Sequence, residues 1–157
     1  KDRFLRKETL QGFVHDEASA FFGGLAGNAG LFSTARDVAR VYQMLLNGGE
    51  IDGQRYLSKE TCQLFTTETS KISRRGLGFD KPDADDPKKG NCAPAAPAEV
   101  YGHTGFTGTC AWVDPVNELV YVFLSNRIYP DVTNRKLNQL HIRERIQGAI
   151  YDAMKKK

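Results

Sequence analysis

The stretch from residue 102 to residue 109 reads GHTGFTGT, and its residue types could line a catalytic site. His103 and Thr104 can present polar atoms at the open edge of a strand, while Gly105 and Gly108 leave room for a ligand or another backbone to approach closely. The same residues are typical of an ordinary strand with a bulge and a hairpin turn. The spacing alone therefore leaves a catalytic strand and a structural hairpin both open.

The sequence supplies no nucleophile for such a strand. None of its six serines is followed by Lys three positions later, and neither Tyr-x-Asn nor Ser-x-Asn occurs. Acyl transfer by covalent catalysis needs a nucleophile with an adjacent base. We therefore expect this chain by itself to be inactive in that chemistry.

Other catalytic patterns are missing as well. The sequence contains no Gly-x-Ser-x-Gly elbow, phosphate-binding loop or dinucleotide fingerprint, and no carboxylate pair stands out as a glycosidase site. His15, Asp16 and Glu17 could be taken for metal ligands, but neighbouring residues of an extended chain point in different directions. His103 and His141 lie too far away in sequence to give ligand spacing. We expect no metal and no cofactor, and we expect His15 and Asp16 to hydrogen-bond locally and fix a glycine-rich loop.

The composition is that of an ordinary soluble domain, with 157 residues, 40% hydrophobic and 26% charged. The net charge of +3 comes partly from lysines 155–157, so no nucleic-acid partner is indicated. The longest apolar run, residues 119–124, is too short to span a bilayer. The three cysteines form no Cys-x-x-Cys pair, and the absence of an initial Met suggests a processed or excised piece.

Residues 1–30 are charged and then glycine-rich, which predicts turns rather than a long helix. A helix follows, because Ser33 or Thr34 can cap it, Asp37 can return the cap interaction and Gly48-Gly49 ends it. Its core-facing residues are predicted to be Ala35, Val38, Ala39, Tyr42, Leu45 and Leu46.

A turn at Asp52-Gly53 precedes a shorter helix, which Ser58 caps and which Leu64 and Phe65 anchor in the core. Residues 80–99 hold four of the six prolines. For this segment we expect a long, exposed and mobile surface loop without regular structure.

From Val100 onward the pattern changes to β structure. Strands are predicted over residues 107–114 and 119–125, and the second is apolar at almost every position, which predicts burial on both faces. A last helix over 137–154 should cover one side of the sheet, and the earlier helices should cover the other. Its predicted apolar stripe is Ile142, Ile146, Ala149, Ile150 and Ala153.

The chain is therefore expected to be a single partial domain over residues 1–157. Residues 1–79 form a glycine-rich segment and helices, residues 80–99 form the flexible loop, and residues 100–157 form antiparallel strands and a C-terminal helix.

Several stretches, in this order, resemble the class C β-lactamase and penicillin-binding-protein-like family of serine hydrolases. They are residues 24–37 (GLAGNAGLFSTARD), 45–49 (LLNGG) and 102–109 (GHTGFTGT). Three further stretches are similar to the β-lactamase-like region fused behind a family 3 glycoside hydrolase (β-N-acetylhexosaminidase type) in some exported bacterial enzymes. These are residues 13–17 (FVHDE), 74–79 (RRGLGF) and 125–127 (SNR).

The resemblance implies an α+β fold, the C-terminal part of the β-lactamase/transpeptidase-like fold, with about three antiparallel strands covered by helices. It also implies that the nucleophilic Ser, its Lys and the Tyr-x-Asn element precede this chain. His103, Thr104 and Gly105 match the family's Lys-Thr-Gly strand, and the backbone N–H of Phe106 would be one oxyanion-hole donor. His in place of Lys departs from the β-lactam-hydrolysing pattern, because His is mostly neutral near pH 7 and gives a substrate carboxylate no permanent cation.

The leading hypothesis is that the complete protein is a periplasmic or extracellular serine hydrolase that acts on an amide, ester or peptide. The alternative is a non-catalytic accessory module of a β-N-acetylhexosaminidase, and glycosidase activity of this piece itself is not expected. The implied partners are the N-terminal half of the same module and a small-molecule or peptide substrate, with no membrane span. An unpaired sheet edge and exposed apolar surface are expected to favour self-association.

Overall fold

The computed structural model describes residues 2, 4–67, 70–83, 85–86 and 90–155. Its elements, in chain order, are α1 Glu17–Phe21, α2 Ala35–Leu46, β1 Glu50–Ile51, β2 Gln54–Arg55, α3 Lys59–Thr67, β3 Tyr101–Thr104, β4 Cys110–Asp114, β5 Leu119–Phe123, α4 Lys136–Gln139 and α5 Ile142–Met154. Helices and antiparallel strands thus form the predicted α+β architecture. Within the described ranges, no helix is long and apolar enough to cross a membrane.

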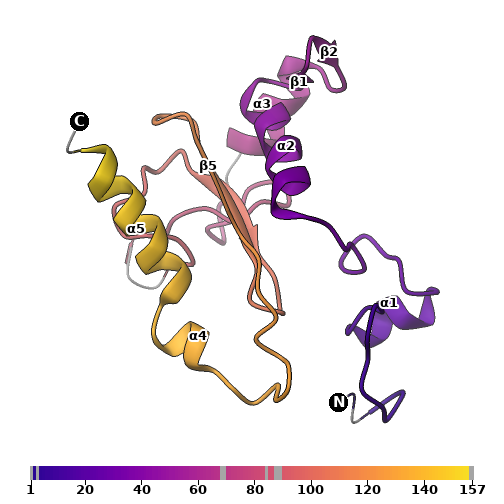
Figure 1. Cartoon of the computed structure of the whole chain (residues 1–157). Helices are drawn as coiled ribbons and strands as arrows, with labels where there is room; N and C mark the ends of the chain where they lie inside the picture. The colour runs from indigo at the N-terminus through magenta and orange to yellow at the C-terminus, as the bar shows by residue number, and fades with distance from the viewer. Residues whose placement is uncertain (1, 3, 68–69, 84, 87–89, 156–157) are drawn as a thin grey trace.

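A three-stranded antiparallel sheet in the order β3-β4-β5 lies at the centre of the molecule (Figure 1). The middle strand, β4, is buried at every residue, whereas β5 buries only Tyr121. The prediction that the second apolar strand is buried on both faces is therefore wrong for β5, because it is an outer strand of this sheet. The first predicted strand is also shorter than expected: β4 begins at Cys110, and residues 107–109 lie in the preceding turn.

The register of the sheet decides which side chains share a face. Gly102 pairs with Trp112, and Trp112 pairs with Tyr121. Because directly paired residues project to the same face, these three lie on one side, and His103, which pairs with Ala111, lies on the other. The first side holds the core cluster of Cys92, Val100, Cys110, Trp112 and Tyr121.

Helix α5 covers the Trp112 side of the sheet, but not with the predicted stripe (Figure 1). Its buried residues are Arg143, Gln147 and Tyr151, and Ile146 is 38% exposed. The hydroxyl of Tyr151 donates to Asp114 Oδ2 at 2.8 Å, and the hydroxyl of Tyr121 donates to the carbonyl of Arg143 at 3.1 Å. These hydrogen bonds favour burial of a face of α5 that the spacing of its apolar residues does not predict. Of the predicted stripe, Ile150 packs against the core.

The last helix is also interrupted. The sequence predicts one helix over 137–154, but α4 ends at Gln139 and α5 begins at Ile142. Between them His141 adopts a left-handed conformation with φ 48°, which a continuous right-handed helix does not contain.

Helix α2 lies on the opposite side of the sheet and contacts β4 and β5 (Figure 1). The cap is as predicted, since Thr34 accepts from the N–H of Asp37 at 3.1 Å. No residue of α2 is fully buried: five of its predicted core-facing residues are half-buried, whereas Ala35 is exposed. Tyr42 nevertheless reaches the sheet through edge-on contacts from Tyr42 to Phe79 and from Phe79 to Tyr101.

The hairpin of β1 and β2 turns at Asp52 and Gly53, both with positive φ, as the sequence predicts. Ser58 caps α3 by accepting from the N–H of Thr61 at 3.1 Å. The predicted anchors Leu64 and Phe65 are 51% and 45% exposed, so that prediction is wrong. Cys62 is the buried residue of α3.

Residues 80–99 contain no helix or strand where they are described, but they are not uniformly exposed as predicted. Asp80, Lys81, Cys92 and Ala93 are buried. Asp80 exchanges two backbone hydrogen bonds with Gly102, and Lys81 Nζ donates to the carbonyls of Thr66 at 3.1 Å and Glu99 at 3.4 Å. The loop is therefore attached to the sheet and to α3 at its start.

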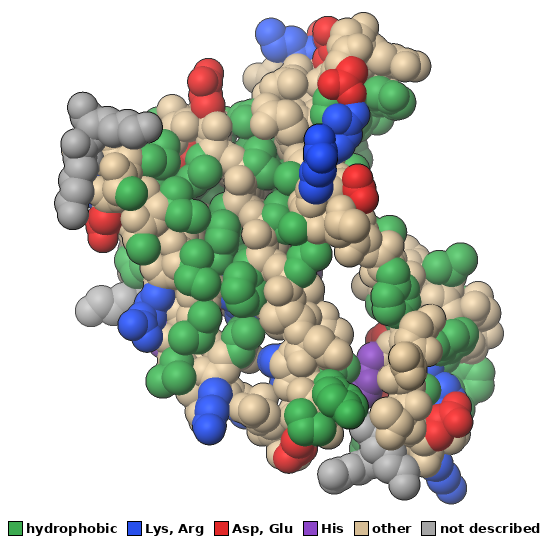
Figure 2. Space-filling model, in the orientation of Figure 1, with side chains coloured by type: hydrophobic (Ala, Val, Ile, Leu, Met, Phe, Trp, Pro, Cys, Tyr) green, Lys and Arg blue, Asp and Glu red, His purple; other side chains and the backbone are tan. Residues whose placement is uncertain are grey.

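Large hydrophobic side chains are exposed over much of the molecule, and they gather on the face over the sheet and α5 in Figure 2. None of the described strands pairs with the outer edge of β5. The expected open edge and apolar surface are both present, and self-association through them stays a prediction.

Candidate active site

The predicted site residues lie at the end of β3 and in the turn that follows it. His103 is exposed, Thr104 is half-buried, and Phe106 is 60% exposed. The backbone folds back tightly here, because Gly105 N–H donates to the carbonyl of Thr109 at 2.8 Å and Gly108 N–H donates to that of Gly105 at 2.9 Å. The strand therefore ends in a closed hairpin tip that presents its polar edge to solvent.

Gly108 is required by this hairpin tip. Its φ of +97° is strained for any residue with a side chain, and a Cβ there would also lie about 3.3 Å from Arg127 Cγ. Ser125, whose hydroxyl donates to the carbonyl of Thr107 at 3.3 Å, closes the other side of the tip. Two of the motif stretches, residues 102–109 and 125–127, are thus packed against each other.

Both ring nitrogens of His103 are engaged. Nδ1 lies 2.6 Å from the carbonyl oxygen of Thr104, and Nε2 lies 2.8 Å from Nη1 of Arg75. A carbonyl only accepts and a guanidinium only donates, so Nδ1 carries the hydrogen and Nε2 is the acceptor. The ring orientation is fixed by one local contact and by one residue 28 positions away.

The ion pair of the neighbouring Arg74 with Asp80 positions Arg75 beside His103. Arg74 donates to Asp80 through two nitrogens, at 2.7 and 3.0 Å, and Asp80 is 1% exposed. Burial alone would raise the pKa of the Asp80 carboxyl, but hydrogen bonds from Arg74 and Asn91 outweigh it and hold that pKa below its usual range. Since Asp80 also pairs with Gly102, this ion pair fixes residues 74–75 beside the strand that carries His103.

The backbone N–H of Phe106 has no hydrogen-bond partner among the described residues. Two polar groups contact the Phe106 ring: the His15 ring stacks on it with centroids 5.6 Å apart, and the Arg127 guanidinium lies 4.8 Å from its centroid. Such contacts restrict an exposed aromatic side chain. The turn therefore holds the amide of Phe106, unpaired among the described residues, beside an aromatic ring that both polar groups contact.

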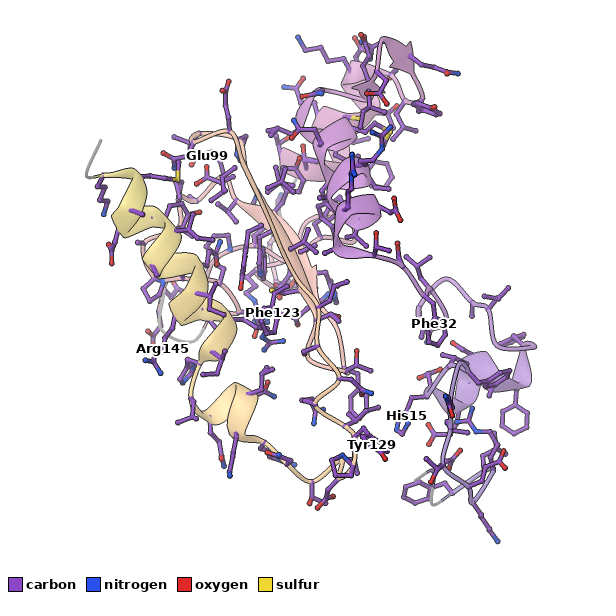
Figure 3. The ribbon with its side chains drawn as sticks, viewed as in Figure 1. His15, Phe32, Glu99, Phe123, Tyr129 and Arg145 are labelled. Atoms are coloured by element: carbon purple, nitrogen blue, oxygen red, sulfur yellow. The ribbon has the colours of Figure 1, made fainter. Side chains whose placement is uncertain are left out.

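His15 reaches Phe106 from the N-terminal segment, which lies apart from the sheet in Figure 1. In Figure 3 its side chain points from that segment toward the rest of the molecule. Arg6 supports its position, because its guanidinium donates to the carbonyl of Val14 at 2.7 Å and to that of His15 at 2.8 Å.

Asp16 behaves as predicted and His15 does not. Asp16 accepts from the N–H of Ser19 at 2.8 Å and from the side chain of Asn28 at 3.3 Å, which fixes the glycine-rich loop. The Ser19 N–H holds the pKa of the Asp16 carboxyl below its usual range. No local side-chain hydrogen bond is made by His15 among the described residues; its ring contact is with Phe106 across the molecule.

A metal centre has no candidate in the described ranges, where no three His, Cys, Asp or Glu side chains come together. His15 and His103 make separate contacts: the His15 ring stacks on Phe106, and the His103 ring lies against Arg75.

Sequence reasoning missed Arg75 and Arg127. Both lie within stretches that resemble the family, residues 74–79 and 125–127, but neither received a role. The only available signal was their presence in those stretches, because the contacts to His103 and Phe106 join segments 28 and 21 positions apart.

Comparisons with known proteins identify the family of this chain. A family model described as Beta-lactamase matches residues 5–144. A protein of Escherichia coli (strain K12) named "Putative D-alanyl-D-alanine carboxypeptidase" is 37% identical over 135 residues, which cover 85% of this chain and 31% of that protein. Relatives of the same name from Salmonella agona and Salmonella typhi match with the same identity and coverage.

Among solved structures, a penicillin-binding protein homolog from Caulobacter crescentus is similar, with a TM-score of 0.45 and 26% identity over 57% of this chain and 24% of that one. The chain spans about a third of the length of the curated relatives it matches. Since the family model covers nearly all of its residues, the chain belongs to the β-lactamase family.

Proposed function

We propose that the complete protein is a serine hydrolase that transfers or hydrolyses acyl groups of an amide, ester or peptide, and that residues 102–106 form one wall of its active site. The observation that carries this proposal is the unpaired amide of Phe106 at an exposed strand end beside His103. Donors aimed at a developing oxyanion are typically worth about 3 kcal/mol of barrier. The relatives named as carboxypeptidases support an amide or peptide substrate.

In this proposal the residues of the chain bind and polarise, and they do not attack. The N–H of Phe106 donates to the carbonyl oxygen of the substrate, most strongly when that oxygen becomes negative in the tetrahedral intermediate. His103 and Thr104 line the edge along which the substrate lies. The attacking hydroxyl and its base come from residues outside this chain, and we propose a periplasmic or extracellular location by likeness to the family.

The test is covalent labelling of the complete protein with a fluorescent penicillin and a fluorophosphonate, followed by mass spectrometry of the labelled peptide. We expect one labelled serine. Phe106→Pro, which removes the amide hydrogen, should slow labelling about 100-fold. Phe106→Ala keeps that hydrogen, so it is the matched control and should slow labelling much less.

Absence of labelling would point to the alternative function. No labelled serine at any probe concentration, in protein that retains a cooperative melt, would contradict acyl transfer. It would favour the alternative, a non-catalytic accessory module of a β-N-acetylhexosaminidase, whose removal should then lower the activity or stability of the attached glycosidase. The isolated chain should not hydrolyse a chromogenic N-acetylglucosaminide under either function.

A further inference from the structure

A cavity of about 330 Å³ lies at the end of the sheet that is remote from the candidate active site. Its walls come from the last residues of α2 and of α3, from loop residues 81, 98 and 99, from the first residue of β3 and from the residue that follows β4. The hairpin tip with Phe106 joins the opposite ends of β3 and β4. In Figure 3, Glu99 lies near the upper end of the sheet, whereas His15, which stacks on Phe106, lies toward the bottom of the view. The cavity is therefore separate from the site described above.

Much of the cavity wall is apolar. Four apolar side chains contribute to it, namely Leu45, Leu46, Ala98 and Pro115. The hydroxyls of its two threonines are engaged within α3, because Thr66 donates to the carbonyl of Cys62 at 2.9 Å and Thr67 donates to that of Gln63 at 2.6 Å. The volume is that of a small ligand pocket, since such pockets span roughly 300–1,000 Å³. The wall therefore suits a small ligand with an apolar body.

Lys81 adds a positive charge to this wall. The residue is 7% exposed, and its Nζ donates to the carbonyls of Thr66 at 3.1 Å and Glu99 at 3.4 Å. An ammonium has three N–H groups, so one remains for a ligand. Within the described ranges, no carboxylate forms an ion pair with Lys81. Burial lowers the pKa of the Lys81 ammonium, and the exposed Glu99 carboxylate offsets that shift only in part.

Tyr101 supplies a second unused donor. It is 3% exposed and lines the same cavity, yet its hydroxyl hydrogen-bonds none of the described residues. A buried tyrosine hydroxyl normally has a partner. Burial raises the pKa of Tyr101, so the hydroxyl keeps its proton at physiological pH and can donate it to an anion.

We propose that this cavity binds a small monocarboxylate with an apolar body, which accepts hydrogen bonds from the ammonium of Lys81 and the hydroxyl of Tyr101. A carboxylate offers acceptor oxygens to both unused donors, and its single negative charge balances that of Lys81. A neutral apolar molecule would leave both donors unpaired, and a dianion would leave a buried charge uncompensated. This proposal does not depend on acyl transfer, because none of the cavity residues belongs to the candidate active site.

Calorimetric titration of the complete protein with three probes tests the carboxylate and the apolar body separately. The first, 3-phenylpropanoate, has both; 3-phenylpropanamide lacks the charge, and acetate lacks the apolar body. We expect 3-phenylpropanoate to bind at least about tenfold more tightly than either of the others.

Tyr101→Phe is the sharpest variant, because it removes the hydroxyl and keeps the packing of the ring. It should weaken binding of 3-phenylpropanoate about tenfold. Its matched control, Tyr56→Phe, lies at a tyrosine that is 60% exposed and should leave the affinity unchanged. Lys81→Met should also weaken binding at least about tenfold, with Lys59→Met at an exposed lysine of α3 as its control. Since Lys81→Met also leaves two backbone carbonyls without a donor, its thermal melt is measured alongside.

Ala98→Phe tests the location of the bound probe. Ala98 is exposed on the loop and lines the cavity, so a phenyl ring there should block binding while both donors remain. Ala95→Phe places the same ring at an exposed position of that loop outside the cavity and should have no effect. These two variants hold even if Lys81→Met fails to fold.

Three results would overturn the proposal. Equal affinities for 3-phenylpropanoate and 3-phenylpropanamide would exclude recognition of the carboxylate. Unchanged affinity in Tyr101→Phe and Ala98→Phe would place the probe elsewhere on the protein, and the absence of saturable binding would refute the site as a whole. Serine labelling is the separate readout for acyl transfer, so either proposal can fail while the other stands.

Discussion

Gly102 lies directly opposite Trp112 in the β3–β4 ladder, and the indole and the carbonyl oxygen of Ala111 together occupy the space that a side chain at position 102 would need. A Cβ placed on Gly102 would lie 2.6 Å from Trp112 Cε3 and 2.8 Å from Trp112 Cα. Trp112 is 1% exposed and belongs to the core cluster, so it cannot move away without disturbing its neighbours. The residue before His103 is therefore fixed by core packing.

Gly102→Ala is expected to lower the free energy of unfolding by about 2 kcal/mol, because the strand must shift to admit the methyl group. The midpoint of thermal unfolding should fall by about 5 °C. Gly27→Ala is the matched control, since nothing lies within 4 Å of a Cβ there. Equal melting temperatures of the two variants would contradict the packing of Trp112 on Gly102.

Asp80→Asn tests the buried ion pair with Arg74 and its dependence on pH. The pKa of Asp80 lies below its usual range in the folded chain, so its charged form stabilises the fold above the unfolded value near 4. That contribution is lost as pH falls through the folded pKa. We expect the variant to be less stable by about 2 kcal/mol at pH 7, with a difference that shrinks toward pH 2.

The measurement is denaturant unfolding of both proteins at a series of pH values, with Asp152→Asn as the control because Asp152 is exposed on α5. A stability difference between Asp80→Asn and the parent that stays constant from pH 7 to pH 2 would show that the carboxylate charge is not what stabilises this contact.

Gln147→Leu should destabilise the chain although it places an apolar residue in the core. Gln147 is 1% exposed and its Oε1 accepts from the N–H of Ala93 at 2.8 Å, so the substitution leaves a buried amide without its acceptor. The expected cost is about 2 kcal/mol in chemical denaturation. Gln63→Leu, on the exposed surface of α3, should change the stability by less than about 0.5 kcal/mol.

The cysteines should be unreactive until the chain unfolds. All three are buried and free, and burial raises the pKa of Cys92 to about 12 and that of Cys110 to about 11, with Cys62 raised as well. Few thiolates are therefore present at pH 8. A chromogenic disulfide reagent should titrate less than one thiol per chain in native buffer and three in guanidinium; three rapid native equivalents would disprove the burial.

Features that depend on nearby residues could be predicted from the sequence. The cap of α2 by Thr34 and its end at Gly48-Gly49 follow from hydrogen bonds and dihedral angles within one turn of the helix. The face that α5 buries could not be predicted in this way. Gln147 faces inward because of an amide 54 positions earlier in the chain, and apolar periodicity does not register such a partner.

The same distinction between local and distant contacts applies to the candidate site. The short motif around His103 was visible in the sequence because its residues are adjacent, and its hairpin tip depends on Gly105 and Gly108 within it. Arg75 was not visible as a site residue, because its approach depends on how the loop of residues 80–99 returns Asp80 to Gly102. Because this loop has no regular structure, its sequence has no periodic pattern from which the contact between Arg75 and His103 could be predicted.

The alternation along β3 has a consequence for how this protein can evolve. Gly102 faces the Trp112 side and His103 faces the Arg75 side, so a slip of the strand by one residue would exchange the two. It would place an imidazole against the indole and leave the guanidinium facing a hydrogen atom. A substitution at position 103 can therefore change the exposed edge without disturbing the core, whereas a side chain cannot be added at position 102 without disturbing it.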